Sequence, residues 1–373
     1  MNEIKIRAID SKSDIDKFLK FAWKIYEGNE YWVPPLLYEK KSILDKKKNP
    51  FFDKADAQLF VAERNSEIVG RIAAIRNDMH NEIHNEKVGF FGFFESINEQ
   101  AVADKLLDTA AEWLRKNGMD SMRGPANLSS NDEWALLIEG FDDPPRIMMP
   151  YNPPYYIDLL ENYGLKKAKD LYAWKIENQK LVKSEKLSRV AEIAKKRSGV
   201  KIRQLNLKDF KNELKIVKYL YNKAWEKNWG FVPMTDPEID KMAKEMKPLV
   251  DPSLVLFAEH EDKPIGFALV IPDYNFIFKK MNGKLLPFNF LKLFTQKKKI
   301  TWARVITLGF IPEFRKRGLD AVFYNEIVHR AAKKGIYTGE ASWILEDNDM
   351  MNRGAKVMNA ELYKRYRVYE KTI

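Results

Sequence analysis

A basic loop with a single glycine lies between an apolar, strand-like run and a helical pattern in the last quarter of the sequence. The run covers residues 306–311, the loop is Arg315-Lys316-Arg317-Gly318, and the helix is expected to extend to about Lys334. The start of a helix carries unpaired N–H groups and partial positive charge, so it favours an anion. The cationic side chains add full charges, and glycine lets a phosphate approach closely. The loop is therefore a candidate phosphate site, and an ordinary basic surface loop is the alternative.

The elements around this loop follow hydrophobic periodicity. Tyr324, Ile327, Val328 and Ala331 recur at the spacing of one buried helix face. The chain has 373 residues, of which 45% are hydrophobic and 13% aromatic, enough for two or three packed domains. Cysteine is absent, which excludes disulfides, thiolate metal sites and a cysteine nucleophile.

Charge and hydropathy indicate which partners to expect. The net charge of +11 suggests phosphate-bearing partners, but the lysines are dispersed and belong to no nucleic-acid motif, so nucleic acid is not expected. The four histidines are too scattered to predict a metal site. No apolar run approaches the roughly 18 residues of a membrane span, so membrane association is not expected and a soluble, cytoplasmic protein is the default prediction. The oligomeric state is not predicted.

Two halves of the sequence show the same order of elements. In the first half, a strand at residues 4–9 and a helix at 13–27 precede a hairpin around Asn65-Ser66, a strand at 88–94 and a helix at 99–116. In the second half, Asn228 to Pro233 matches Asn29 to Pro34, and residues 257–266 match residues 61–70. We predict two copies of one α/β (α+β) domain, at residues 1–178 and 201–373, with a linker helix within residues 179–200.

These residues resemble the GNAT acyltransferase superfamily. Its acyl-CoA motif, Gln/Arg-x-x-Gly-x-Gly/Ala after a central strand, is matched by Arg315 and Gly318, whereas Asp320 replaces the last small residue. The resemblance implies in each domain a mixed, mostly antiparallel sheet flanked by helices, and an acyl-CoA site, most simply for acetyl-CoA. The cofactor-binding residues it implies are Phe310, Ile311, Arg315, Lys316, Arg317, Gly318, Leu319, Asp320 and Asn348. Asp320 could instead be the N-cap of the helix.

The first copy departs further from the family motif. Its equivalent loop, residues 94–100, contains Glu95 and Glu99 and no Arg-x-x-Gly, so this copy is not expected to bind CoA. The loop-rich stretch from Arg123 to Pro150 mixes polar and aromatic residues, as an acceptor pocket would. The substrate residues predicted on this side are Asn127, Asn131, Glu133 and Tyr156. A long ordered loop without ligand is the alternative.

Acyl transfer from a thioester to an amine requires a base and a polarised carbonyl. The resemblance places the polarising backbone N–H near Phe310. Glu340, early in the expected fifth strand of the second copy, is the first candidate for the base, and Glu346, expected on the same strand face, is the second. The next helix has no tyrosine for protonating the thiolate. The acid is therefore unassigned, or supplied by Tyr363, Tyr366, water or the first domain, and the methionines of that helix are expected in the core.

Between Tyr274 and Thr301 the second copy gains an insertion in which aromatic and aliphatic residues alternate with lysines. We expect it to pack on the sister domain; the alternatives are an interfacial membrane helix and a hydrophobic lid over a greasy substrate. A final hairpin is expected at residues 361–371. Together these features predict an acyl-CoA-dependent N-acyltransferase acting on a small-molecule or peptide amine. A catalytically silent protein that keeps the fold is the alternative.

Overall fold

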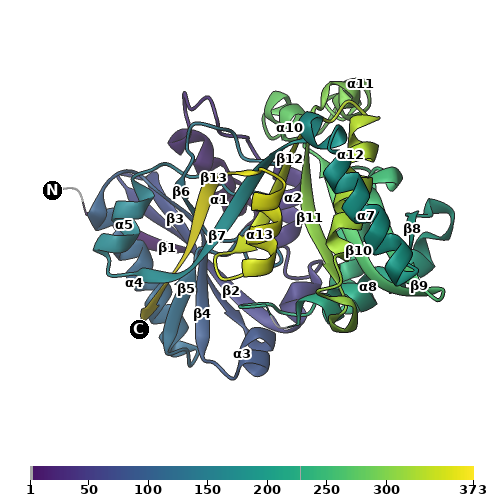
Figure 1. Cartoon of the computed structure of the whole chain (residues 1–373). Coiled ribbons are helices and arrows are strands. Elements are labelled where there is room, and N and C mark those ends of the chain that lie inside the picture. Colours follow the sequence, from purple (N-terminus) through teal and green to yellow (C-terminus); the bar gives the residue numbers. More distant parts are fainter. Residues whose placement is uncertain (1–2, 227) are drawn as a thin grey trace. The chain divides into compact units, whose positions relative to one another are not determined.

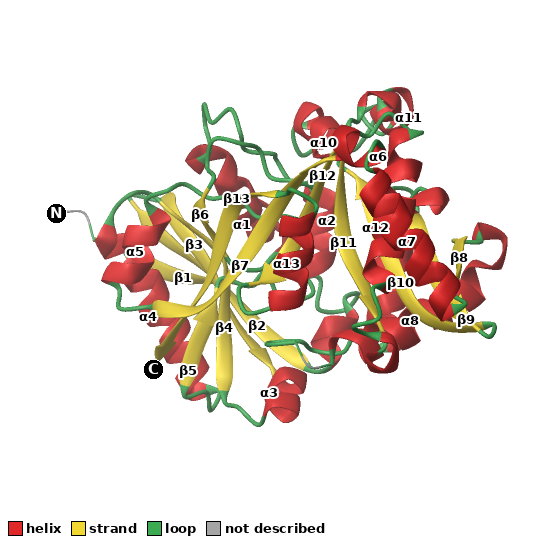
Figure 2. Cartoon of the chain, in the orientation of Figure 1, coloured by secondary structure: helices red, strands yellow, loops and turns green. Residues whose placement is uncertain are grey.

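The computed structural model describes residues 3–226 and 228–373. The chain forms two compact units. The first comprises residues 1–171, 278–289 and 364–373, and the second comprises residues 172–277 and 290–363. Each unit is a sheet with helices packed against it (Figures 1 and 2), which confirms the predicted fold class.

The sheet of the first unit has the strand order β1-β2-β3-β4-β5-β13-β7, and β6 also pairs with β13. The pairs β1–β2, β2–β3, β3–β4 and β5–β13 are antiparallel, and β4 and β5 are parallel. The elements that begin in this unit are β1 (Lys5–Ile9), α1 (Lys12–Ile25), α2 (Leu37–Leu44), η1 (Pro50–Asp53), β2 (Ala55–Arg64), β3 (Glu67–Asn77), α3 (Asp78–His84), β4 (Val88–Ser96), α4 (Gln100–Lys116), β5 (Ser121–Gly124), β6 (Leu136–Glu139), α5 (Tyr156–Asn162) and β7 (Lys166–Glu177).

Local sequence explains these elements well. Asn65 and Ser66 both have positive φ, as a two-residue hairpin turn requires, and they join β2 to β3. Helix α4 buries Val102, Leu106 and Leu114 completely, and these side chains pack in the core against β3. The predicted hairpin, third strand and helix of the first copy are therefore confirmed.

The sheet of the second unit has the order β12-β11-β10-β9-β8, with β11 and β12 parallel and the other pairs antiparallel. Its elements are α6 (Asn178–Val182), α7 (Glu185–Ser198), β8 (Lys201–Gln204), η2 (Leu207–Asp209), α8 (Phe210–Trp225), α9 (Asp236–Met246), η3 (Pro252–Leu254), β9 (Val255–His260), β10 (Lys263–Pro272), α10 (Asn275–Met281), α11 (Leu291–Thr295), η4 (Lys297–Lys299), β11 (Trp302–Phe310), η5 (Pro312–Phe314), α12 (Leu319–Ala332), β12 (Thr338–Leu345), α13 (Asp349–Val357) and β13 (Glu361–Thr372). The parallel pair occupies the same place in the element order as β4 and β5, as two copies of one domain predict.

Three segments differ from the sequence-based picture. The predicted final hairpin is wrong: residues 361–372 form the single strand β13, whose end pairs with β5 and so completes the first unit. The predicted linker helix is two helices, α6 and α7, both within the second unit. Helix α7 ends at Gly199, which caps it in the left-handed conformation.

The insertion is divided between the two units. Residues 278–289 belong to the first unit, where Trp23 Nε1 donates to Asn282 Oδ1 at 2.8 Å and the Leu37 amide donates to the Gly283 carbonyl at 3.1 Å. Several large apolar side chains between residues 286 and 294 remain exposed. In the part of the chain that is described, no helix combines the length and hydropathy needed to cross a membrane.

Candidate active site

Strands β11 and β12 pair only at their beginnings. The parallel ladder joins Trp302–Val305 to residues 338–341, and beyond it no pairing is found between the described residues of the two strands. A register shift on the other edge of β11 leaves Ile306 as an extra residue opposite β10. Such a bulge bends a strand and interrupts its ladder. The Thr307 hydroxyl next to the bulge is buried and has no hydrogen-bond partner among the residues that the structure describes.

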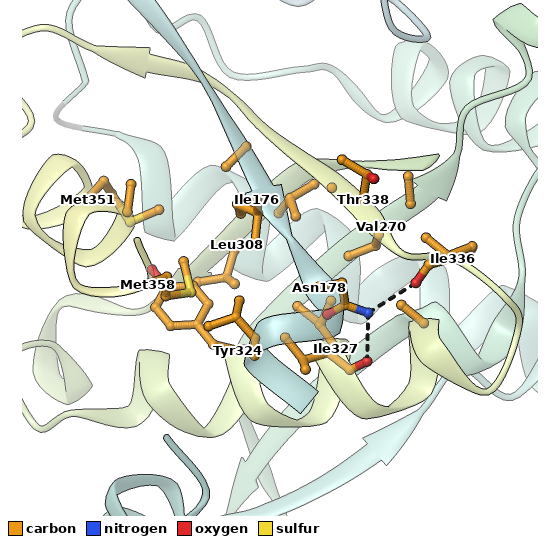
Figure 3. Close-up of a pocket in the computed structure, with 18 of the residues that line it drawn as sticks. Ile176, Asn178, Val270, Leu308, Tyr324, Ile327, Ile336, Thr338, Met351 and Met358 are labelled. Atoms are coloured by element: carbon orange, nitrogen blue, oxygen red, sulfur yellow. Dashed lines mark hydrogen bonds between the residues drawn. The ribbon is translucent and has the colours of Figure 1, made fainter. Parts of the chain in front are cut away.

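An apolar cavity of about 60 Å³ lies in the second unit beside this divergence. Val305 and Leu308 of β11, Ala341 and Ile344 of β12, and residues of α12 and α13 line it. Figure 3 shows Met351, Met358 and Tyr324 gathered at one end of the cavity. Near the other end, Asn178 donates to the carbonyls of Val328 and Ile336, both at 3.0 Å, which ties α6 to α12 and to the segment before β12.

Tyr324 brings a hydroxyl to a mostly apolar lining, whose other polar residues are Asn178 and Thr338. The hydroxyl oxygen lies 3.1 Å from the point that a β-carbon on Gly354 of α13 would occupy. Burial, and secondarily the negative charge of Asp320 one turn earlier on α12, raises the pKa of Tyr324 far above its ordinary value. Tyr324 therefore keeps its proton at any physiological pH and can donate a hydrogen bond inside the cavity.

The basic loop leads directly into α12. Gly318 is the N-cap, with φ of +72°, and a β-carbon there would meet only Ala194 Cβ, at 3.9 Å. The prediction that Asp320 could be the N-cap is wrong, because Asp320 is the second residue of the helix. Lys316 and Arg317 are exposed, and the Arg317 guanidinium lies 4.8 Å from the centre of the Phe314 ring.

Arg315 differs from its neighbours in the loop. Its Nε donates to the Phe310 carbonyl at 3.1 Å and its Nη2 to the Ala224 carbonyl at 2.5 Å, so it fastens the loop to the end of β11 and to α8. The Ile311 amide donates a hydrogen bond to the Ile265 carbonyl at 2.9 Å. Leu319 is buried in the core. Of the predicted cofactor residues, Lys316, Arg317 and Gly318 are thus the ones that face solvent.

Glu340 lies in a buried polar cluster. Arg304 is its cross-strand partner, with Nε at 3.6 Å from Glu340 Oε1, and both side chains are almost completely buried. The Ser342 hydroxyl donates to Glu340 Oε1 at 2.6 Å, and the Tyr363 hydroxyl donates to Oε2. Gly339 and Ala341 line the cavity, whereas Glu340 points to the opposite sheet face because side chains alternate along a strand.

The other polar candidates lie past the end of β12. The strand ends at Leu345, so Glu346 is outside it and is half-buried in the following turn, not on the strand face predicted by alternation. Asn348 is the N-cap of α13, and its side-chain oxygen accepts from the Met351 amide at 3.2 Å. On α13, Met351 and Met358 line the cavity as core-like residues, but Met350 is exposed, which corrects the prediction for that side chain.

Solved structures with this architecture have been described. A tandem GNAT protein from the clavulanic acid biosynthesis pathway aligns over 99% of this chain and 98% of its own, with a TM-score of 0.59 and 11% identity. A GCN5-related N-acetyltransferase from Sphaerobacter thermophilus covers 99% of this chain and 95% of its own, with a TM-score of 0.53 and 12% identity. The fold is that of tandem GNAT proteins.

Two curated proteins are similar in sequence over their whole length. Protein YghO of Escherichia coli is 35% identical over 99% of this chain and 95% of its own. The bacterial ceramide synthase of Caulobacter vibrioides is 33% identical over 100% of this chain and 98% of its own. No protein family model matches the chain. The chain belongs to the family of these two proteins, and it has the tandem GNAT fold.

In the first GNAT unit, the chain itself occupies the place that corresponds to the parting of β11 and β12 in the second. Strand β4 pairs with β5 over Val88–Phe90, and β5 ends at Gly124. Beyond that point the Ala126 amide donates to the Phe91 carbonyl at 2.7 Å, and the Phe93 amide donates to Asn127 Oδ1 at 2.7 Å. A β-carbon on Gly92 would stand 1.7 Å from the Ala126 carbonyl oxygen. The chain after β5 therefore occupies the space beside β4 in this GNAT unit.

Two of the predicted substrate residues meet in the same place. Asn127 Nδ2 donates to Glu133 Oε2 at 2.7 Å, and Lys40 Nζ donates to Glu133 Oε1 at 2.7 Å. Burial alone would raise the pKa of Glu133, but the charge of Lys40 and these hydrogen bonds lower it below its ordinary value. Asn131 is in the adjoining loop, where its amide donates to the Ser129 hydroxyl at 3.1 Å.

Tyr156 is not part of this group. It is 1% exposed, and its hydroxyl donates to Glu95 Oε2 at 2.6 Å and accepts from the Ser96 amide at 3.0 Å. Arg71 Nη2 lies 3.4 Å from the other Glu95 oxygen. Burial raises the pKa of Glu95 in spite of Arg71. The acidic loop predicted from the sequence is thus partly an internal polar network of the first GNAT unit.

A cleft in the first GNAT unit was not predicted. The cleft has a volume of about 580 Å³ and is lined by residues of α1, the following loop and the insertion. Tyr26 and Trp32 stack with ring centres 4.6 Å apart, and Trp23 meets Trp32 edge-on at 5.2 Å. The spacing of Trp23 and Tyr26 on one helix face was the available sequence signal, but Trp32 joins them only through the fold. Among the described residues no group of three or more histidines and carboxylates could hold a metal ion.

Proposed function

We propose that the chain is an acyl-CoA-dependent N-acyltransferase whose donor binds in the second GNAT unit. The observation that carries the proposal is the divergence of β11 and β12 beside an apolar cavity, directly before a basic loop and an open helix start. In the first unit the chain that follows β5 stays hydrogen-bonded to β4, so its own residues fill the corresponding place. One donor site per chain follows from this contrast.

The residues present fit a CoA thioester. Lys316, Arg317 and the backbone amides at the start of α12 would hold the phosphates, because that end of the helix favours negative charge and Gly318 leaves space there. The orphaned Thr307 hydroxyl gives the donor a polar partner where the strands part. The cavity would take the apolar part of the donor.

Catalysis requires further groups of this chain. We propose Tyr324 as the hydrogen-bond donor to the leaving sulfur, since Tyr324 lines the cavity and its hydroxyl keeps its proton. The candidates for the base are Glu346, half-buried in the turn after β12, and Glu340, which is paired with Arg304 and accepts from Ser342 and Tyr363. The amine loses a proton to the base, its nitrogen bonds to the acyl carbon, and the C–S bond breaks to give an amide and a thiolate. The thiolate accepts the hydrogen bond of Tyr324 and then takes up the proton held by the base to become a thiol.

Two observations bear on the length of the acyl group, and they favour different lengths. A cavity of about 60 Å³ equals roughly four or five water-sized spheres, which suits an acetyl group. The alternative is a long acyl group. It is favoured by the relative named as a bacterial ceramide synthase and by the adaptable methionines Met351 and Met358 at the cavity end. Because a ceramide is an amide of a long-chain amino alcohol, the same relative favours an amphiphilic amine as acceptor.

Calorimetric titration with CoA, acetyl-CoA, octanoyl-CoA and palmitoyl-CoA tests the donor site directly. We expect binding in the micromolar range with one site per chain, and the tightest donor identifies the acyl length. The acceptor is then sought by following free-thiol release with small amines, peptide amines and long-chain amino alcohols. No binding above millimolar affinity would contradict the enzyme proposal. Tight binding without thiol release for any amine would favour a catalytically silent protein. A cytoplasmic location stays a prediction, to be tested by fractionation.

A further inference from the structure

The segment from residue 284 to residue 299 combines exposed apolar side chains with positive charge. Leu286 is 70% exposed, Phe288 74% and Phe294 74%, and Phe290 and Leu291 are exposed as well. Five large apolar side chains within nine consecutive residues are thus in contact with water. Such a cluster of exposed apolar side chains marks an interaction surface. Figure 2 shows the short helix α11 at the outer edge of the second unit, where an external partner can reach it.

The charge around these side chains is of one sign. The sequence has no aspartate or glutamate between Asp273 and Glu313, and it has seven lysines there. Lys284, Lys298 and Lys299 are exposed, and Lys297–Lys299 form the short helix η4 immediately after α11. A second copy of the chain placed symmetrically on this surface would bring lysines against lysines, which disfavours self-association. The charge therefore requires a negatively charged partner.

We propose that residues 284–299 form a peripheral docking surface for an anionic lipid bilayer. Leu286, Phe288, Phe290, Leu291 and Phe294 enter the boundary between headgroups and acyl chains, and the lysines contact the anionic headgroups. This division between apolar and cationic side chains is the one that interfacial membrane segments use. An acidic protein could pair with the lysines, but charge pairing alone does not explain why five exposed aliphatic and aromatic side chains lie in one short segment. The surface is independent of the proposed catalysis.

Cosedimentation of the full chain with vesicles tests this proposal. The vesicles contain either phosphatidylcholine alone or phosphatidylcholine with about a third phosphatidylglycerol, in salt from 50 to 500 mM, values chosen to span the screening range. We expect binding to the anionic vesicles at low salt and little binding to the neutral ones. The variant K297Q/K298Q/K299Q should lower the partition coefficient roughly 100-fold, since each lysine near such a surface contributes about fivefold. The variant F288S/F294S should lower it on the order of tenfold or more.

Matched controls separate docking from general effects. Tyr38 and Val357 are as exposed as Phe288, at 76% and 75%, and lie outside the segment, so Y38S/V357S should bind like the natural protein. All variants change exposed side chains, and unchanged thermal unfolding confirms that they fold. The proposal is overturned if the natural chain stays in the supernatant with anionic vesicles, or if Y38S/V357S loses binding as strongly as F288S/F294S. Binding that depends on the lysines and not on the phenylalanines would instead favour an acidic protein partner.

Discussion

The hydroxyl oxygen of Tyr324 lies 3.1 Å from the position of a β-carbon on Gly354, so the absence of a side chain at Gly354 gives this hydroxyl its place. The two residues come from different helices, α12 and α13, on either side of the cavity. No tyrosine is present on α13 itself. The structure thus brings a phenol next to α13 from the neighbouring helix.

Tyr324→Phe should lower turnover on the order of 10- to 100-fold while leaving CoA affinity nearly unchanged, because only the hydrogen bond to the leaving sulfur is lost. Steady-state kinetics and calorimetry measure the two effects separately. Gly354→Ala should also lower turnover, because the new methyl group displaces the hydroxyl. In the double variant the alanine should add little. The control is Tyr337→Phe, which removes an exposed hydroxyl. A parallel loss of turnover and affinity in Tyr324→Phe would show a structural role instead.

Gly318→Glu should weaken acyl-CoA binding at least tenfold, because it places a negative charge where the phosphates are expected. Gly335 offers a matched control. It has φ of +77° against +72° for Gly318, no heavy atom stands near its missing β-carbon, and it lies beyond the other end of α12. Both glutamates carry a similar backbone penalty of about 1 kcal/mol. Calorimetry should therefore find the affinity of Gly335→Glu unchanged, and equal affinities for the two variants would refute the proposed phosphate site.

Glu340→Gln and Glu346→Gln should separate a structural carboxylate from a catalytic one. Glu340 and Arg304 are buried together, and removing one charge of such a pair costs about 3–5 kcal/mol of stability. Urea unfolding should show this loss for Glu340→Gln. Glu346→Gln changes a half-buried turn residue, so its unfolding midpoint should remain near that of the natural protein while turnover falls. Full turnover in Glu346→Gln would remove it as the proposed base.

His80 should make the stability of the first unit depend on pH. Burial, opposed by a hydrogen bond with Glu86 and reinforced by the charges of His84 and Arg123, lowers the pKa of His80 to about 4. The unfolded chain, with an ordinary pKa near 6.5, binds the proton more readily. The stabilisation is therefore present above pH 6.5 and is lost as the pH falls towards 4, with a loss of about 2 kcal/mol between pH 7 and pH 5.

Urea unfolding of the natural chain and of His80→Gln at pH 7 and pH 5 tests this dependence. His80→Gln should show a smaller decrease in stability between the two pH values, because glutamine does not titrate. The comparison variant is His84→Gln, which changes the neighbouring, less buried imidazole. An equal decrease in the natural chain and in His80→Gln would contradict the assignment.

Short-range patterns in the sequence were sufficient to predict most individual elements. The alternation around Asn65-Ser66 gave the hairpin, the spacing of Ile327, Val328 and Ala331 gave the buried face of α12, and the repeated order gave the two copies. The Gly318 loop was also predicted, because its glycine, charges and following helix are adjacent in the chain. These features depend on local backbone preference and side-chain periodicity, which the sequence displays directly.

Only the tertiary structure decided which side chains meet across elements. It paired Glu340 with Arg304, placed the Tyr324 hydroxyl against Gly354, and used Asn127 to close the gap in the first unit. It also placed the end of β13 in the first unit, whereas the sequence predicted a final hairpin in the second. Burial and partners arise from contacts between residues distant in the chain, and one sequence without related sequences does not display such contacts. For that reason the basic loop could be predicted, but the cavity beside it could not.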